Sequence, residues 1–304
     1  MSTGSHLVDS LLLDGHTVIV LDNFSTGNRR NLEHWQSERL VVFSHDVINE
    51  ISPNVDQIYH LASIASPAHY MTNPMKTMET NIFGTVNMLN LAAKQNATLL
   101  LASTSEVYGD PLEHPQKESY WGNANPIGPR ASYVESKRAC ETWASIYKRQ
   151  KKLSIRIARI FNTYGPRMQI NDGRVVSNFI VQALRNETLS IYGHGNQTRS
   201  FLYISDLVEG LKALMKSSEQ EPTNIGHSEE ISINELVKTL DHNFANKKLA
   251  IKHLDGIIED PKRRRPDLKK AQRVLDGWKP KKLLKDGLRE TLAYFNDLMQ
   301  QIKS

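Results

Sequence analysis

The chain has 304 residues, of which 39% are hydrophobic and 23% are charged, as is ordinary for a soluble globular protein. No stretch approaches the roughly 20 consecutive apolar residues that a membrane-spanning helix needs. The opening MSTGSHLVDSLLLDGH does not read as a signal peptide, because it has no basic leader. Cys140 is the only cysteine, which excludes an internal disulfide and a cysteine-based metal site. We expect Cys140 to be buried in a helix rather than reactive.

The net charge of +5 is unevenly distributed along the chain. Twelve basic and three acidic residues lie between Lys262 and Arg289, so this basic segment carries +9 and the remainder about −4. Such a segment is either a solvated basic face or a contact for nucleic acid, acidic lipid or a small anionic ligand. Nucleic acid is the weakest of these interpretations, because Trp278 is the only aromatic residue in the segment that could stack on a base.

Short β-branched runs alternate with helix-length segments through the first half of the chain. Strands are predicted over residues 17–22, 40–46, 57–63, 98–104 and 154–162, and helices over 74–94 and 133–150. Helical periodicity continues in 177–186, 205–217 and 283–302. Strands separated by helices form βαβ units, so we expect an α/β fold, a Rossmann-like doubly wound parallel sheet with a smaller C-terminal lobe. The loops 109–130 and 162–174 are long for a compact domain, and such loops usually carry function.

The segment YVESK places Tyr133 and Lys137 four residues apart, on one face of a predicted helix. A nearby ammonium group stabilises a phenolate and lowers the pKa of a tyrosine, which would make Tyr133 a general base for a hydroxyl proton. A surface tyrosine and lysine would show the same spacing. The position of the pair, opening a helix after a strand and a long loop, favours the catalytic interpretation.

Polar side chains also follow the predicted strand 98–104. Thr104 and Ser105 can donate and accept hydrogen bonds, and Glu106 can act as acid, base or orienting group. A single polar turn after a strand is usually capping chemistry. Combined with the tyrosine and lysine about 30 residues later, the three groups indicate a catalytic site.

Asp22 ends the predicted strand 17–22. An acidic side chain there can bind the ribose hydroxyls of an adenosine and disfavours the 2′-phosphate of NADP, although it could equally cap the next turn. The strand ends at 45–47 and 60–63 would bring further groups to a dinucleotide. We expect His60 to be a packed histidine rather than a catalyst.

With these motifs the sequence resembles the extended short-chain dehydrogenases/reductases and, among them, the UDP-glucuronate decarboxylases. The similarity runs nearly end to end, through VLDNFSTG, DQIYHLAS, ASTSEVYGDP, ARIFNTYGPRM, GNQTRSF and RRPDLKKA. The stretches NPIGPR and NDGRVVSNFI distinguish this family from general epimerases and dehydratases.

The resemblance implies a role for each matching residue. The catalytic set is Tyr133, Lys137, Thr104, Ser105, Glu106 and Arg264. The cofactor is NAD, with contacts from Asp22, Asn23, Ser25, Thr26, Gly27, Asp46, Val47, Leu61, Ser63, Thr77, Tyr133 and Lys137. The UDP-sugar is expected to contact Lys76, Asn162, Arg174, Arg199, Tyr203 and Arg264. Residues 1–162 with about 202–226 would form the NAD-binding domain, and about 163–201 with 227–304 the UDP-sugar-binding lobe.

Two features depart from the family pattern. Family members carry a first strand and a Gly-rich turn of the GGAGFVG type before GSHL, whereas here only Gly4 matches the last glycine. That strand is the centre of the sheet and its turn holds the pyrophosphate, so NAD binding is the step that this departure affects. YVESKR also replaces the usual YDEGKR, and we expect Val134 and Ser136, which lie off the tyrosine–lysine face, to be tolerated.

The resemblance implies decarboxylation of UDP-glucuronate to UDP-xylose by oxidation at C4, loss of CO₂ and re-reduction. The alternatives are a sugar-nucleotide 4-epimerase or 4,6-dehydratase and a catalytically impaired paralogue that only binds. The family also suggests a homodimer through helices near the active site. The compartment would be the Golgi lumen behind an N-terminal anchor, or otherwise the cytoplasm.

Overall fold

A four-stranded parallel sheet runs through the larger part of the molecule, in the strand order β10 (Thr223–Ile225), β5 (Ile155–Ile160), β4 (Thr98–Thr104), β3 (Gln57–His60). The computed structural model describes residues 2–242, 249–256 and 258–303. Helix α3 (Pro74–Gln95) connects β3 to β4, and α4 (Ala131–Lys151) connects β4 to β5. A helical crossover returns the chain to the same end of the sheet, so that neighbouring strands run parallel. The predicted α/β fold with a parallel sheet is confirmed.

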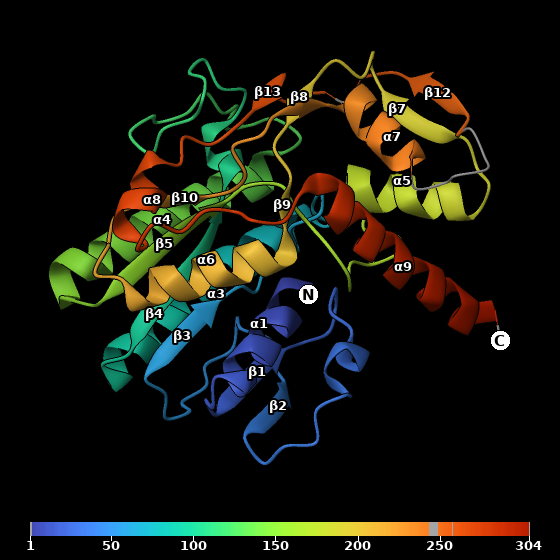
Figure 1. Ribbon diagram of the computed structural model, residues 1–304. Coiled ribbons are helices and arrows are strands. Elements are labelled where there is room, and N and C mark those ends of the chain that lie inside the picture. Colours follow the sequence, from blue (N-terminus) through green and yellow to red (C-terminus); the bar gives the residue numbers. More distant parts are fainter. Residues whose placement is uncertain (1, 243–248, 257, 304) are drawn as a thin grey trace.

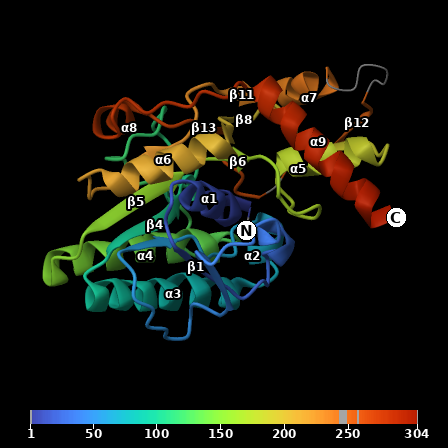
Figure 2. The ribbon, with the colours of Figure 1, turned by 60° about the horizontal axis from the view of Figure 1, so that its bottom comes forward.

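Helices cover both faces of this sheet. Figure 2 shows α3 and α4 on one face and α6 (Ile204–Lys216) on the other, with α1 (Ser2–Leu13) beside α6. The side chains of β4 alternate between the two layers, because successive strand residues point to opposite faces. Leu99 and Leu101 join the hydrophobic core of α3 and α4, whereas Leu100 joins the core that includes α6. Cys140 of α4 is fully buried in the first core, as predicted.

A second, two-stranded parallel sheet consists of β1 (Val18–Asp22) and β2 (Leu40–Ser44), linked through η1 (Arg29–Leu32). Together with α1 it has its own small hydrophobic core, centred on Val8, Leu12 and Leu32. Figure 1 shows this unit, in dark blue, below the larger sheet. Within the described residues no strand lies between β1 and β3, in line with the expected departure from the family pattern.

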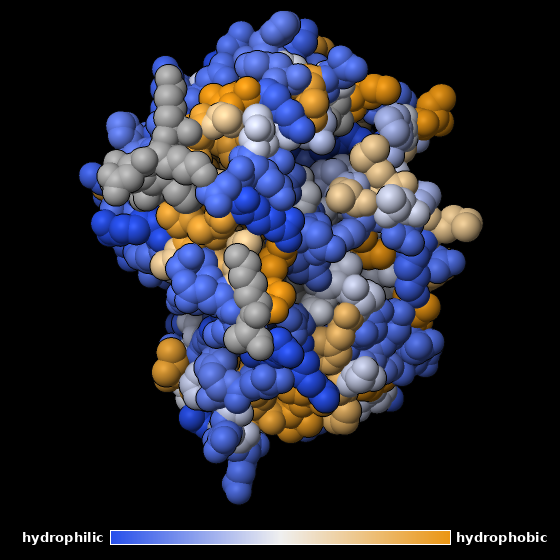
Figure 3. Space-filling model, turned by 90° about the vertical axis from the view of Figure 1, so that its right-hand side faces the viewer, coloured by the Kyte–Doolittle hydropathy of each residue, from blue (hydrophilic) through white to orange (hydrophobic). Residues whose placement is uncertain are grey.

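The C-terminal half adds three small sheets: β6 (Thr163–Tyr164) with β9 (Leu202–Tyr203), β7 (Leu189–Tyr192) with β12 (Ile251–Leu254), and β8 (Thr198–Arg199) between β11 (Ile231–Ser232) and β13 (Arg263–Arg264). The remaining helices are α2 (Pro67–Tyr70), η2 (Ser105–Tyr108), α5 (Val175–Leu184), α7 (Ile233–Asp241), α8 (Lys269–Val274) and α9 (Leu284–Lys303). A capping box of Ser232 and Glu235 begins α7. Figure 3 shows the molecule from the right-hand side of Figure 1. Hydrophilic residues dominate this side, and hydrophobic residues form separate patches.

The strands and helices predicted from periodicity are confirmed to within a few residues. The sequence pattern did not predict α1, α7 or the two-residue strands, and a strand of two residues is too short for its alternation to be detected. The division into two domains stays a prediction, since one hydrophobic core includes residues from both. None of the described helices combines the length and apolar character that crossing a membrane requires.

Leu100→Ala tests the packing of β4 between two layers. Leu100 is fully buried, so its truncation leaves a cavity, and we expect the free energy of unfolding to fall by about 2–5 kcal/mol in urea denaturation. The matched control is Leu112→Ala, at a loop residue that is 82% exposed, which should change it by about 0.5 kcal/mol or less. Equal losses in the two variants would contradict this packing.

Candidate active site

A cavity of about 340 Å³ opens at the carboxyl ends of β4 and β5, and we call it the central cavity. Parallel strands bring their carboxyl ends to one edge of a sheet, where ligands bind in open α/β folds. The structure brings all six predicted catalytic residues to this cavity: Thr104, Ser105, Glu106, Tyr133, Lys137 and Arg264.

Tyr133 and Lys137 lie in the first two turns of α4, and both side chains are buried. The Nζ of Lys137 donates to the carbonyl oxygen of Ala102 in β4 at 2.8 Å. A polar interaction with the side chain of Thr104 favours the ionised form of the Tyr133 phenol. The ring of Tyr70 stacks on the Tyr133 ring, with centroids 5.0 Å apart and planes within 4° of parallel. These contacts hold the phenol at the wall of the cavity.

The pKa of Tyr133 is raised, not lowered. Burial raises it well above its ordinary value, and the interaction with Thr104 offsets only part of this effect. Burial also lowers the pKa of Lys137, whose ammonium group donates to a main-chain carbonyl. The sequence-based expectation for this pKa was wrong because it counted the charge of Lys137 and left out desolvation.

Glu106 is the second residue of η2 and lies between two guanidinium groups. Its Oε1 accepts a hydrogen bond from Nη1 of Arg264 at 2.6 Å, and its Oε2 accepts one from Nη2 of Arg130 at 2.9 Å. Burial alone would raise the pKa of this carboxyl group, but Arg264 and Arg130 outweigh burial and lower the pKa to about 2. Glu106 is therefore ionised at neutral pH. Of the three roles left open by the sequence, this arrangement favours that of an orienting group.

Asp260 extends the ion cluster across the cavity wall. Its Oδ1 lies 3.3 Å from Nη1 of Arg130, and its Oδ2 accepts from Nη2 of Arg199 at 2.8 Å. Three guanidinium groups thus face two carboxylates. In the described part of the chain, the buried Nε and Nη2 of Arg264 have no hydrogen-bond partner. Because buried donors without acceptors are costly, the cluster is suited to an anionic ligand group.

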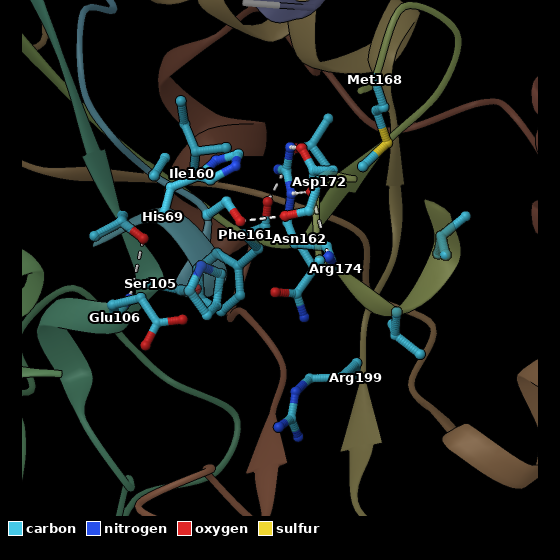
Figure 4. Close-up of a pocket in the computed structure, with 18 of the residues that line it drawn as sticks. His69, Ser105, Glu106, Ile160, Phe161, Asn162, Met168, Asp172, Arg174 and Arg199 are labelled. Atoms are coloured by element: carbon cyan, nitrogen blue, oxygen red, sulfur yellow. Dashed lines mark hydrogen bonds and ion pairs between the residues drawn. The ribbon is translucent and has the colours of Figure 1, made fainter. Parts of the chain in front are cut away.

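The predicted substrate residues Asn162, Arg174 and Arg199 also line the central cavity. Figure 4 shows Arg174 held by Asp172, whose Oδ2 accepts from Nη2 of Arg174 at 2.7 Å. This ion pair fixes the guanidinium group just before the start of α5.

Two predicted substrate residues lie elsewhere. Tyr203 donates its hydroxyl proton to Oε2 of Glu290 in α9 at 2.6 Å, and it does not line the central cavity. Lys76 donates to Oδ2 of Asp46 at 2.9 Å, on the side of the predicted cofactor residues. Each side chain is held by a carboxylate that lies far away in the sequence, and a comparison of sequences alone does not reveal such contacts.

Most predicted cofactor residues line a second cavity of about 500 Å³, which we call the strand-edge cavity. Asp22 is at its end, where its Oδ1 accepts the N–H of Phe24 at 2.7 Å, so the turn-capping role is realised beside the cavity. Both cavities share three predicted residues: Thr26, Leu61 and Ser63. The others at the strand-edge cavity are Asn23, Ser25, Asp46 and Val47.

Gly27 and Thr77 line neither cavity. A Cβ on Gly27 would lie 2.8 Å from Oδ2 of Asp22, so a larger residue would displace this carboxylate. Thr77 is fully buried in α3 and donates to the carbonyl oxygen of Asn73. Neither side chain forms part of a cavity wall, and both residues contribute to the packing around the site.

The site contains residues that the sequence interpretation missed, namely Arg130, Asp260 and Tyr70. Arg130 lies within the NPIGPR stretch and three residues before Tyr133, which is the signal that could have found it. Asp260 gave no such signal, because its contacts reach back 61 and 130 residues.

Comparison with known proteins identifies the family. Residues 2–291 match the family model described as GDP-mannose 4,6 dehydratase. UDP-glucuronic acid decarboxylase 1 of Danio rerio is 54% identical over 294 residues, covering 96% of this chain and 70% of the relative. The chain belongs to the UDP-glucuronic acid decarboxylase family. The family member from Arabidopsis thaliana, UDP-glucuronic acid decarboxylase 1, is 51% identical over 97% of this chain and 67% of its own length.

Solved structures support the same fold for this UDP-glucuronic acid decarboxylase family member. UDP-glucose 4-epimerase of Thermotoga maritima, with UDP-glucose, superimposes with a TM-score of 0.88 at 29% identity, covering 98% of this chain and 96% of that one. UDP-glucuronic acid 4-epimerase of Bacillus cereus, in complex with UDP-glucuronic acid and NAD, gives 0.88 at 27% identity over 97% and 96%. The Rossmann-like fold is thereby confirmed.

Glu106→Gln removes the charge between the two arginines. Folding lowers the pKa of Glu106, so its carboxylate stabilises the fold above its ordinary pKa of 4.5, and this contribution is lost as the pH falls through about 2. We expect the free energy of unfolding, measured by urea denaturation, to be higher for the wild type than for the variant. This difference should be largest at neutral pH and should shrink as the pH falls below 4.5.

The matched control is Glu79→Gln at an exposed position of α3, which should change stability little at any pH. A difference between wild type and Glu106→Gln that stays constant from pH 7 to pH 3 would argue against an ionised, arginine-paired Glu106.

Proposed function

We propose that this protein is an NAD-dependent UDP-glucuronate decarboxylase that releases CO₂ and forms UDP-xylose. The observation that carries the proposal is the placement of Tyr133 and Arg264 in the wall of one cavity. The tyrosine can take the proton of a sugar hydroxyl, and the arginine can hold a carboxylate. The 54% identity to UDP-glucuronic acid decarboxylase 1 of Danio rerio supports this chemistry.

The charges of the central cavity support a substrate with two anionic parts. UDP-glucuronate carries a diphosphate and a carboxylate, and five arginines line the cavity, Arg174, Arg199 and Arg264 among them. Guanidinium groups bind both kinds of anion with paired hydrogen bonds. Arg264, next to Glu106, is suited to the sugar carboxylate, whereas Arg174 and Asn162 of the same cavity are suited to the UDP part.

The NAD-binding side chains fit the two ends of a dinucleotide. Asp22 ends β1 at the strand-edge cavity, and Tyr133 and Lys137 line the central one. The first turn of α1 borders both cavities through Thr3 and Gly4, and a helix N-terminus favours the negative charge of a diphosphate. Bound NAD supplies an acceptor that takes a hydride from C4 of the sugar and returns it, so that it is not consumed.

The residues of this chain then move a proton and hold the sugar. Tyr133 accepts the proton of the C4 hydroxyl group as the phenolate, a form that burial disfavours and that the Lys137 ammonium group, one turn along α4, would stabilise. The C4 ketone is β to the carboxylate, so the carbon–carbon bond breaks, CO₂ leaves and the electron pair is delocalised into the carbonyl. A proton then adds at C5, and Tyr133 returns its proton to the C4 oxygen. Glu106 remains ionised and keeps Arg264 and Arg130 in place.

Turnover of UDP-glucuronate by the chain with NAD⁺ tests the proposal. We expect labelled CO₂ to be released and UDP-pentose to form, as measured by trapping and mass spectrometry. Tyr133→Phe should reduce kcat by about 10²–10⁴-fold, because it removes the proton acceptor. Tyr147→Phe, on the same helix but bonded to Asn90 at the exposed side, should leave kcat unchanged.

Three results are distinguished by this experiment. CO₂ and UDP-pentose together support the decarboxylase. A C4 epimer that retains the labelled carboxylate would assign the chain to the 4-epimerases instead. Absence of any product with the native chain would contradict the proposal and leave the catalytically impaired paralogue.

We also infer that the protein forms a homodimer through α3 and α4. These helices pack against each other, and they expose large apolar side chains: Met75, Met78, Phe83 and Trp143. Clustered exposed apolar residues on neighbouring helices are typical of an interface between subunits.

Phe83→Asp tests the dimer. A charge within an apolar interface costs binding free energy, so we expect sedimentation equilibrium to give twice the 34.5 kDa chain mass for the wild type and one chain mass for the variant. Phe43→Asp introduces the same charge at an exposed position of β2 and should leave the mass unchanged. A monomeric wild type would refute the dimer.

A further inference from the structure

Gln116 of the 109–130 loop is a fully buried polar residue that lines neither cavity. A buried amide must find hydrogen-bond partners within the protein, because each unpaired polar group costs free energy. The partners of Gln116 therefore show what this residue holds in place. One of them is the main chain of Arg265, which lies 149 residues away in the sequence and directly follows Arg264.

The main chain of Gln116 pairs with the residues that follow β13. Its N–H donates to the carbonyl oxygen of Arg265 at 2.8 Å, and its own carbonyl oxygen accepts from the N–H of Asp267 at 2.8 Å. These two hydrogen bonds form a parallel bridge between Gln116 and Pro266. The loop thus acts as a short neighbouring strand for the segment that continues from Arg264.

The side chain of Gln116 adds a third contact to the same segment. Its Oε1 accepts the N–H of Arg265 at 2.8 Å, while its Nε2 donates to the carbonyl oxygen of Glu113 in its own loop at 2.8 Å. Both main-chain groups of Arg265 are therefore held by one residue. The N–H of Arg265 belongs to the same planar peptide unit as the Cα of Arg264, so the direction of this N–H fixes where that Cα lies.

Arg264 is held from its other side as well. It is the parallel partner of Arg199 in the pairing of β13 with β8, and its Nη1 donates to Oε1 of Glu106 at 2.6 Å. The guanidinium group is thus bound at its tip by Glu106, while the position of its Cα depends on Gln116 and β8. A shift of the main chain would move the guanidinium group out of the geometry that paired hydrogen bonds to a carboxylate need.

Asn224 connects this junction to the parallel sheet. It is fully buried on β10, and its Nδ2 donates to the carbonyl oxygens of Gln116 at 2.9 Å and of Asp267 at 3.2 Å. Its Oδ1 accepts from the hydroxyl group of Tyr108 at 2.7 Å. Tyr108 ends η2, the short helix that carries Glu106. Both partners of the buried ion pair are therefore anchored to one set of buried hydrogen bonds.

We propose that Gln116 is a positioning residue, which holds Arg264 in the orientation that binds the sugar carboxylate and does not itself touch the substrate. The inference rests on the proposed function, in which Arg264 takes that carboxylate. It makes recognition of the carboxylate depend on the contact between the 109–130 loop and the segment after β13. Loss of the Gln116 side chain should then weaken the binding of a UDP-sugar that has a carboxylate and spare the binding of one that lacks it.

Gln116→Met tests the inference with the full 304-residue chain. Methionine keeps the length of the side chain and removes the amide that binds Arg265 and Glu113. Calorimetric titrations measure the dissociation constants of UDP-glucuronate and UDP-glucose, which have a carboxylate and a hydroxymethyl group, respectively, at the same position. We expect the variant to bind UDP-glucuronate about tenfold more weakly, as for the loss of a hydrogen bond to a charged group, and UDP-glucose as the wild type does.

Thr291→Val is the matched control for a loss of stability. Thr291 is fully buried in α9, lines neither cavity and donates to the carbonyl oxygen of Gly287 at 2.6 Å. The substitution therefore removes a buried hydrogen bond with little change of volume, and this variant should bind both ligands as the wild type does. An equal loss of affinity for both ligands in Gln116→Met, or no loss for UDP-glucuronate, would overturn the inference.

Failure of the proposed function would give a different result. A wild type that binds UDP-glucuronate no more tightly than UDP-glucose would contradict the contact between Arg264 and the sugar carboxylate, and both proposals would fall. A wild type that prefers UDP-glucuronate, with a Gln116→Met variant that keeps the full preference, would overturn only the role of Gln116.

Gln116→Glu supplies a second variant of nearly the same shape. One of its carboxyl oxygens can still accept the N–H of Arg265, so its preference for UDP-glucuronate should lie closer to that of the wild type than the preference of Gln116→Met does. Circular dichroism checks the fold of each variant. A lower preference in Gln116→Glu than in Gln116→Met would contradict the role of this hydrogen bond.

A double-mutant cycle in urea tests the positioning without any ligand. If Gln116 holds Arg264 against Glu106, Gln116 and Glu106 are coupled. Gln116→Met combined with Glu106→Gln should then lower the urea midpoint by less than the sum of the two single effects. Thr291→Val combined with Glu106→Gln should give the sum of its single effects. Additivity for Gln116→Met as well would overturn the positioning role.

Discussion

The buried ion cluster around Glu106 is the constraint on which the active site depends. A carboxylate removed from water needs compensating charge, and here two guanidinium groups from distant segments supply it. Arg130 comes from the end of the 109–130 loop, and Arg264 from the basic segment near the C-terminus. Asp260 then connects Arg130 to Arg199. The end of β4, a long loop and the C-terminal lobe are thereby held to one another at the cavity, and the loops could not be rearranged without leaving buried charges unpaired.

The basic segment, residues 262–289, contains both buried and exposed basic side chains. Arg264 is buried at the cavity wall, whereas its neighbour Arg263 and most lysines of the segment are exposed. The interpretation as a solvated face therefore describes the exposed part of the segment, and contact with an anionic ligand stays a proposal for Arg264. Only the ion pair with Glu106 distinguishes the buried arginine from the exposed ones, and that contact spans 158 residues of sequence.

Periodicity predicted the parallel sheet and its helices, because alternation and helical spacing report directly on burial. The spacing of Tyr133 and Lys137 and the polar turn at Thr104 also led to the site, since strand order places both at one edge. What the sequence did not reveal depends on three-dimensional contacts: the charge partners of Glu106, and the burial that raises the pKa of Tyr133. The family match was needed for the substrate residues, of which Tyr203 lies outside the central cavity. The individual residue roles, the two-domain division and the compartment stay predictions.

The separate core of α1, β1 and β2 has a consequence for cooperativity. Val8, Leu12 and Leu32 form a small cluster that does not merge with the large one, so this unit can open locally without the rest of the fold. It is tied to the remainder by polar contacts, such as Arg167 to Asp9 and Gln169 to the carbonyl oxygen of Thr26. A ligand that touches both units binds only when they are docked. By linkage, such a ligand raises the free energy needed to open the smaller unit. The two units then unfold together in one cooperative transition.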